Sequence, residues 1–119
     1  MKVAVIGSRG LAVDDLEKYL PSDTTEIVSG GAKGVDTSAR EYALAYCLQL
    51  TEFLPDYKAF GRGAPLKRNI TIITYADMVL AFWDGRSRGT KYVIDRCKDM
   101  GVPVRVFLPI NNSREVVVQ

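Results

Sequence analysis

The sequence has 119 residues, of which 47% are hydrophobic and 25% charged, and its formal net charge is +2 at pH 7. This length fits one globular domain, the composition excludes intrinsic disorder, and so small a net charge does not by itself predict nucleic-acid binding. Histidine is absent, which excludes histidine acid–base chemistry, serine or cysteine nucleophiles activated by histidine, and zinc sites that need imidazole.

The two cysteines, Cys47 and Cys97, are fifty residues apart, a spacing that fits neither a metal clip nor a redox CxxC motif. We expect both thiols to be buried in a reducing cytoplasm. The apolar run 3–6 is too short for the core of a signal peptide. The uncharged stretch 42–51 is about half of the ~20 residues that a membrane span needs. The sequence therefore predicts a soluble, cytoplasmic protein.

Short apolar runs alternate with helical patterns in the first half of the chain. Residues 3–6 predict a strand buried on both faces. Residues 14–20 predict a helix closed by a proline, and residues 26–28 a second strand. Apolar side chains on one helical face predict a helix over 35–46, and residues 48–54 are expected to form a third strand.

The same alternation continues in the second half. A proline suited to the first helical turn opens a predicted helix over 65–75. Residues 78–82 predict a fourth buried strand. A helix over 90–100 ends at a glycine followed by a proline, and residues 104–108 form the fifth predicted strand. The tail 111–119 combines a turn signal with three valines, and either pairs with another segment or frays.

Five alternations of strand and helix with short connections are typical of a mostly parallel sheet covered by helices on both faces. With right-handed crossovers, this pattern favours a Rossmann-like three-layer α/β/α sandwich, with a five-stranded sheet in the order 3-2-1-4-5. We expect one nucleotide-binding domain over 1–110 and a C-terminal tail over 111–119.

Ligands of such sheets bind beyond the carboxyl ends of the strands, where the strand order reverses, here between the first and fourth strands. Four loops are expected at this edge, residues 7–10, 29–34, 55–64 and 83–89, and they hold nine of the ten glycines. A general preference of turns for glycine would not favour one edge over the other. The bias therefore indicates a ligand site at this edge.

The loop 29–34 leads directly into a predicted helix and is a candidate phosphate-binding loop. Glycines let its backbone N–H groups converge, and a helix N-terminus adds partial positive charge. It is not a Walker A loop, because Lys33 precedes Gly34 and no Lys-Ser or Lys-Thr pair follows. The loop 7–10 is not a dinucleotide fingerprint, because Arg9 stands where the second glycine is needed.

Basic residues gather at the same predicted edge. The planar guanidinium of arginine suits phosphate or carboxylate. The residues expected there are Arg9, Lys33, Arg62, Lys67, Arg68, Arg86 and Arg88. Each could be a solvated surface charge, but together, beside glycine-rich turns, they favour an anionic ligand.

Several polar or aromatic residues have two interpretations each, one structural and one as a ligand contact. Asp36 opens the second helix, where its carboxylate either caps the helix or favours the helix dipole, or else accepts a hydrogen bond from a ribose hydroxyl. Trp83, followed by Asp84, either stacks on a base or covers the end of the sheet, and we favour stacking. Asn69 either bonds a ligand or faces solvent. Residues 87–90 give a second loop-to-helix turn rich in donors.

Four motifs taken in order resemble the small single-domain members of the SLOG superfamily, in particular the YspA/YpsA-related group. They are Gly7-Ser8-Arg9, Val28-Ser29-Gly30-Gly31-Ala32-Lys33-Gly34-Val35-Asp36, Ala64-Pro65-Leu66-Lys67-Arg68-Asn69, and Phe82-Trp83-Asp84-Gly85 followed by Ser87-Arg88-Gly89-Thr90. The resemblance spans about residues 2–108. It implies a Rossmann-like fold that binds a nucleotide or a nucleotide-derived ligand. The residues expected to bind it are Gly7, Ser8, Arg9, Ser29, Gly30, Gly31, Ala32, Lys33, Gly34, Asp36, Arg68, Asn69, Trp83, Asp84, Ser87, Arg88, Gly89 and Thr90.

The chain is also similar, more distantly, to LOG-type phosphoribohydrolases, which remove the base from nucleoside monophosphates. Arg68 and the Gly89-Thr90 pair match the motifs of those enzymes, but Asn69 replaces their lysine and Val93 their glutamate. That glutamate is expected to support an oxocarbenium-like transition state.

Without this glutamate, the catalytic residues of such a hydrolase stay unknown. The candidates in this chain are Arg68, to position a phosphate, and the carboxylates Asp84 and Asp36. Asp95 is a weaker candidate, because it lies two places beyond the glutamate position and is expected to face elsewhere on its helix.

The second distant relative is the single-strand-DNA-loading protein DprA, which the chain resembles at residues 7–9 and 29–36. The flanking domains of DprA are missing, and a near-neutral charge is poorly suited to a polyanion, which needs several phosphate contacts. Nucleic acid is therefore not expected as a partner.

The favoured interpretation is a module that binds a nucleotide or an ADP-ribose- or NAD-like ligand. Such a module could act as a sensor. We expect no metal and assign no certain cofactor. The alternatives are a hydrolase of N-glycosidic or phosphate-ester bonds in nucleotides, single-stranded nucleic-acid binding, and a structural role. A homodimer or higher homo-oligomer is expected on general grounds. The helix over 65–75 has apolar residues beyond one face, which suit either an interface or packing within the monomer.

Overall fold

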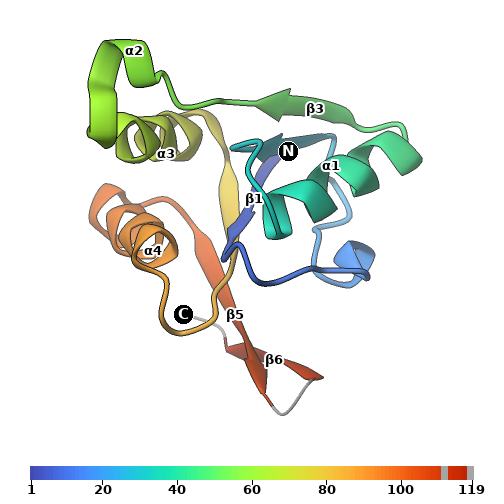
Figure 1. Ribbon diagram of the computed structural model, residues 1–119. Helices are drawn as coiled ribbons and strands as arrows, with labels where there is room; N and C mark the ends of the chain where they lie inside the picture. The colour runs from blue at the N-terminus through green and yellow to red at the C-terminus, as the bar shows by residue number, and fades with distance from the viewer. Residues whose placement is uncertain (111–112, 118–119) are drawn as a thin grey trace.

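The computed structural model describes residues 1–110 and 113–117. Its centre is a six-stranded sheet in the order β3-β2-β1-β4-β5-β6 (Figure 1). The strands are β1 (Lys2–Gly7), β2 (Glu26–Ser29), β3 (Gln49–Glu52), β4 (Met78–Phe82), β5 (Val104–Ile110) and β6 (Ser113–Val117). The first five are parallel, which confirms the predicted order 3-2-1-4-5. Strand β6 forms within the predicted tail and is antiparallel to β5. Residues 111–112 and 118–119 of that tail lie outside the described residues.

Helices cover both faces of the sheet and complete the three-layer sandwich (Figure 1). On one face, α1 (Val35–Ala45) buries Val35, Ala39 and Ala43, which recur every four residues along one helical stripe. On the other face lie α3 (Ala64–Tyr75) and α4 (Arg88–Met100). Three short helices complete the described chain: η1 (Leu16–Lys18), α2 (Tyr57–Phe60) and η2 (Gly61–Gly63).

The alternating side chains of β1 divide the core into two clusters. Val3 and Val5 face the cluster that includes α1, whereas Ala4 and Ile6 face the cluster built by α3 and α4. This alternation is the two-residue period of a strand. Because both faces are covered, nearly every position of β1 is apolar, which is why the run was recognisable in the sequence.

The apolar face of α3 is used within the chain. Ile72 and Ile73 are buried, and Ile70 and Tyr75 pack against the same cluster. The apolar residues of α3 that suit an oligomer interface are therefore buried in the core or packed against it. The expected oligomer remains a prediction without support from this helix.

The prediction of a helix over 14–20 is wrong, because only the single 3₁₀ turn η1 forms there. The buried side chain of Leu16 fixes this turn, and the Val13 N–H donates to Ser38 Oγ (2.9 Å), which ties the preceding backbone to α1. So short a segment before Pro21 cannot offset the cost of nucleating an α-helix. The helix α2, where Asp56 Oδ1 accepts from the Ala59 N–H (3.1 Å), was not predicted.

The prediction of two buried thiols is confirmed for Cys97 and wrong for Cys47, which is exposed. Cys47 follows the end of α1 with φ 55°, and the Leu48 N–H donates to the Ala43 carbonyl (2.9 Å). This is the hydrogen bond of a Schellman motif, which places the residue after the helix in a solvent-facing left-handed turn.

The two thiols should therefore differ in reactivity. Burial raises the pKa of Cys97 to about 11, and the thiolate is the reactive form. With a disulfide reagent at about pH 8, we expect one thiol to react in the native protein and two in denaturant. Cys47→Ser should lower the native count to zero. A native count of two would contradict the packing around Cys97.

Among the described residues, no helix has the length and apolar character needed to cross a membrane.

Candidate functional site

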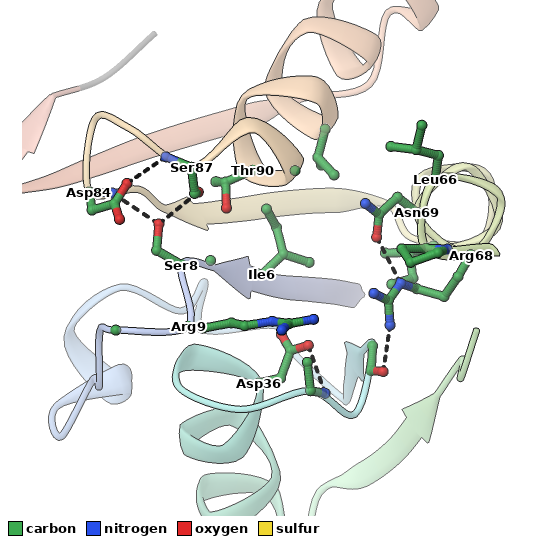
Figure 2. A pocket seen from close by; sticks show the side chains of 18 residues that line it. Ile6, Ser8, Arg9, Asp36, Leu66, Arg68, Asn69, Asp84, Ser87 and Thr90 are labelled. Carbon is green, nitrogen blue, oxygen red and sulfur yellow. Dashed lines mark hydrogen bonds between the residues drawn. The ribbon is translucent and has the colours of Figure 1, made fainter. Parts of the chain in front are cut away.

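A cavity of about 440 Å³ opens at the carboxyl edge of the sheet, where the order reverses between β1 and β4 (Figure 2). Its walls come from four segments: the end of β1 and the turn after it, the loop between β2 and α1 with the first turn of α1, residues 65–72 of α3, and the loop from β4 into α4 with the start of α4. This volume lies within the range of small-molecule sites, roughly 300–1,000 Å³. The cavity is therefore at the position that the strand order predicts.

The cavity has an apolar floor. Ile6 comes from β1, Ile72 from α3 and Val93 from α4, and all three also belong to the hydrophobic core. Pro65 and Leu66 continue this surface to the rim, where Leu66 is 43% exposed. The floor can contact a planar or aliphatic part of a ligand.

Arg68 lies at one end of the cavity and is half-buried. Its Nη1 donates to the carbonyl oxygens of Gly30 (2.6 Å) and Phe53 (3.5 Å), and its Nε donates to Asn69 Oδ1 (2.8 Å) (Figure 2). A Cβ on Gly30 would collide with this guanidinium, so glycine is needed for the close approach. Burial lowers the pKa of Arg68 and the charge of Asp36 opposes this shift; arginine nevertheless stays protonated in proteins.

Asp36, in the first turn of α1, is a buried carboxyl that lines the same cavity. Its Oδ2 accepts from the Ala32 N–H (3.0 Å), which fixes the loop before α1. Burial raises the pKa of Asp36, and the Ala32 N–H and the Arg68 charge oppose this shift. Figure 2 shows the Arg9 side chain reaching into the cavity toward Asp36. Asp36 thus holds the loop before α1 and makes no N-cap hydrogen bond, whereas the predicted dipole role and the ribose contact stay predictions.

The pKa of Asp36 predicts how stability depends on pH. Because this pKa lies above the ordinary value of 3.8, the folded chain keeps a proton that the unfolded chain has already lost. Stability should therefore fall as pH rises through the raised pKa. Asp36→Asn keeps an acceptor for Ala32 and removes the titration.

We expect the unfolding free energy of this variant, minus that of the wild type, to increase from about pH 4 to pH 7. Urea unfolding at several pH values measures it. A difference independent of pH would mean that the Asp36 carboxyl is not desolvated.

Two serines and Asp84 form the opposite end of the cavity. The Ser8 and Ser87 hydroxyl oxygens lie 3.0 Å apart, and Ser8 Oγ accepts from the Asp84 N–H (3.1 Å) (Figure 2). Asp84 Oδ1 accepts from the Arg86 and Ser87 N–H groups (both 2.8 Å), which lowers the pKa of this exposed carboxyl. Asp84 therefore shapes the loop that leads into α4.

The N-terminus of α4 faces this end of the cavity through Ser87, Gly89 and Thr90. The first N–H groups of a helix lack intrahelical acceptors and carry partial positive charge. On the neighbouring turn, Gly34 has φ +73°, and a Cβ there would collide with the backbone of Arg9. This contact holds the turn after β1, and with it Arg9, against the loop before α1.

The structure brings most of the predicted site residues together. Those that line the cavity are Gly7, Ser8, Arg9, Gly30, Ala32, Asp36, Arg68, Asn69, Asp84, Ser87, Gly89 and Thr90. Those that do not are Ser29, Gly31, Lys33, Gly34, Trp83 and Arg88. Of the seven basic residues expected at this edge, only Arg9 and Arg68 line the cavity.

Trp83 does not reach the cavity, although we expected it to stack on a base. Its Nε1 donates to the Ser87 carbonyl (3.0 Å), and its ring packs against the core cluster of α3 and α4. The structure therefore favours the second interpretation of Trp83, in which the ring covers the end of the sheet. Ser29 is buried in β2, and Lys33 and Arg88 are exposed outside the cavity.

Comparison with known proteins gives one informative similarity. No protein-family model matches the chain, and no solved structure matches it. These results do not test the resemblance to SLOG proteins, which stays a prediction. The chain is 33% identical over 87 residues to the Gene 61 protein of Mycobacterium phage D29, a match that covers 68% of this chain and 70% of the phage protein. At this identity and coverage, the chain belongs to the same protein family as the phage Gene 61 protein.

Proposed function

We propose that the chain binds a nucleotide or a nucleotide-derived ligand, of ADP-ribose or NAD type, in the cavity between β1 and β4. One observation carries the proposal: a single cavity combines two arginines, a helix N-terminus and an apolar floor. The resemblance to SLOG proteins supports the same class of ligand.

The anionic part of the ligand is supported by charge. Arg9 and Arg68 line the cavity together, and the Arg9 charge contributes to lowering the pKa of Arg68. An anion between two like charges relieves this repulsion, and arginine suits phosphate in particular. The N-terminus of α4 adds partial positive charge at the other end of the cavity.

The remainder of the ligand is supported by the floor. The floor offers an apolar surface for a base or sugar, formed by Ile6, Ile72 and Val93. Small-molecule sites typically combine such a surface with a few placed polar groups. Inorganic phosphate would leave this surface unused. A nucleotide uses both parts of the cavity.

A thermal-shift panel tests the proposal. The panel is AMP, ADP, ATP, GTP, NAD, ADP-ribose and inorganic phosphate, each near millimolar. A ligand at 100 times its Kd adds about 2.7 kcal/mol, which for a domain of this size raises Tm by roughly 8–16 °C. We expect a shift with at least one nucleotide and a much smaller one with inorganic phosphate. No Tm shift with any compound, or a shift with inorganic phosphate as large as the shift with the nucleotides, would contradict the proposal.

Asp36 favours a second candidate, a hydrolase that cleaves an N-glycosidic bond of the bound nucleotide. The LOG-type hydrolases that the chain resembles carry a glutamate at the position of Val93. Val93 lines the cavity but has no carboxylate. Asp36 is a buried carboxyl in the same cavity, and such groups are typical of functional sites. In contrast, Asp84 is exposed and holds its own loop, and Asp95 bonds Lys91 (3.0 Å) on the exposed face of α4.

In this reaction, water adds to the sugar carbon as the C–N bond breaks, and the base leaves with a proton. Chromatography of reaction mixtures would detect the free base. We expect its release to be lost in Asp36→Asn and kept in Asp95→Asn. If a nucleotide that binds tightly is never cleaved at high protein concentration, the hydrolase candidate is excluded and the binding proposal stands.

A further inference from the structure

An exposed apolar shelf lies beside the cavity. It consists of Leu54, Tyr57, Phe60 and Leu66, which are 65%, 58%, 49% and 43% exposed. Two of these side chains belong to α2, which packs against α3 at the outside of the molecule (Figure 1). These four exposed apolar side chains on adjoining segments are a candidate binding surface.

The shelf is continuous with the cavity. Leu66 belongs to both. A Cβ on Gly31 would meet the Leu54 side chain, so Leu54 packs against the loop that supplies the cavity wall. Tyr57 lies close enough to the Arg68 guanidinium to influence its pKa. Because Leu66 lines the cavity and α2 packs against α3, a ligand that extends past Leu66 is directed toward the segment that carries Tyr57 and Phe60.

The charges around the shelf restrict what can cover it. Lys67 Nζ lies 5.3 Å from the centroid of the Phe60 ring, and Lys58 and Arg62 are exposed in the same segment, where the exposed carboxylate is the helix cap Asp56. A symmetric contact with a second copy would bring these like charges together. An aromatic group attached to phosphates is complementary to both the rings and the cations, and bases stack readily on aromatic side chains.

We infer that the ligand is a dinucleotide, two nucleosides joined through phosphates, whose first nucleotide lies in the cavity and whose second base stacks on Tyr57 and Phe60. The inference rests on the proposed function and extends it by naming the ligand class. The cavity of about 440 Å³ lies toward the lower end of the small-molecule range, so the second nucleoside lies outside it. Phe60 and Tyr57 are then specificity-determining residues.

A matched pair of ligands tests the inference by calorimetry. Diadenosine diphosphate and ADP-ribose share an adenosine, a diphosphate and a second ribose, and differ in the second adenine. We expect wild type to bind diadenosine diphosphate roughly 5- to 100-fold more tightly. Phe60→Ala and Tyr57→Ala should each reduce this preference, and Phe60→Ala should leave the affinity for ADP-ribose unchanged. Tyr46→Ala, an equally exposed aromatic at the end of α1, should keep the preference.

The possible failures are distinguishable. If ADP-ribose binds and diadenosine diphosphate binds no more tightly, or if the preference survives in both shelf variants, the inference is overturned and the proposed function stands. If neither ligand binds to wild type, the proposed function itself is contradicted for this ligand class, and the inference falls with it. Tighter, Phe60-dependent binding of a short oligothymidylate than of diadenosine diphosphate would assign the shelf to a single strand and overturn the dinucleotide.

Discussion

Replacing Phe82 with alanine should lower the free energy of unfolding by about 3–5 kcal/mol, the usual cost of removing a buried phenylalanine ring. Phe82 is 1% exposed and ends β4. Its ring stacks on Phe107 (centroids 4.9 Å apart) and meets the edge of Tyr19 (5.1 Å). Three aromatic rings thus pack together in the core, and removing one of them leaves a cavity among the other two.

Urea unfolding of Phe82→Ala measures this loss, with Phe60→Ala as a control of the same chemical change. Phe60 is 49% exposed on α2, so its replacement should change the unfolding free energy by at most about 0.5 kcal/mol. A loss below about 1 kcal/mol for Phe82→Ala, or equal losses in the two variants, would contradict the packing of this cluster.

Arg68→Gln should weaken ADP-ribose binding by roughly 10- to 100-fold, because a charge-assisted hydrogen bond to phosphate contributes about 1.5–3 kcal/mol. Calorimetric titration measures the change. Arg86→Gln is the matched control: it removes the same charge from the same edge, but Arg86 is exposed and does not line the cavity. Its effect should be at most a few-fold. Equal losses in the two variants would mean that the general field of this edge, rather than contact with Arg68, attracts the anion.

Because Arg68 also bonds the Gly30 and Phe53 carbonyls, its replacement could act through the loop alone. Arg68→Lys addresses this point, since lysine keeps the charge and loses the planar fork. We expect its affinity to lie between those of wild type and Arg68→Gln. Similar affinities for the two variants, with unfolding free energies equally reduced, would indicate a structural role.

The elements that could be predicted best were strands covered by helices on both faces and elements whose ends carry a glycine or a proline. The fourth strand was expected over 78–82 and is observed as Met78–Phe82, because every residue of this run packs against one of the two helical layers. The segment 14–20 has a helical pattern but is too short before Pro21 to offset the cost of nucleation, and the chain just before it is held by the hydrogen bond from Val13 to Ser38 Oγ. That hydrogen bond joins residues 25 apart, which no local pattern encodes.

The location of the site was predictable, and its lining only partly. Parallel strands bring their carboxyl ends to one edge, so the loops that meet there follow from the strand order. Whether a loop side chain faces the cavity depends on packing: Trp83 turns toward the core instead. Ile72 and Val93 line the cavity but have the helical spacing of core residues, so no sequence signal distinguished them. Leu66 belongs to the motif 64–69, and its place at the rim of the cavity follows from its exposure, which the sequence does not encode.

The central claim is that this cavity is the nucleotide site, and titration of ¹⁵N-labelled protein with ADP-ribose tests it most directly by NMR. We expect the amide shifts of residues 7–10, 30–36, 66–69 and 84–90 to change together and to saturate with a single Kd, because each of these segments contains residues that line the cavity. Amides on the opposite edge of the sheet, such as Thr25 and Gly101, should stay unchanged. Saturable changes confined to that opposite edge, or none at all with any nucleotide of the panel, would contradict the account.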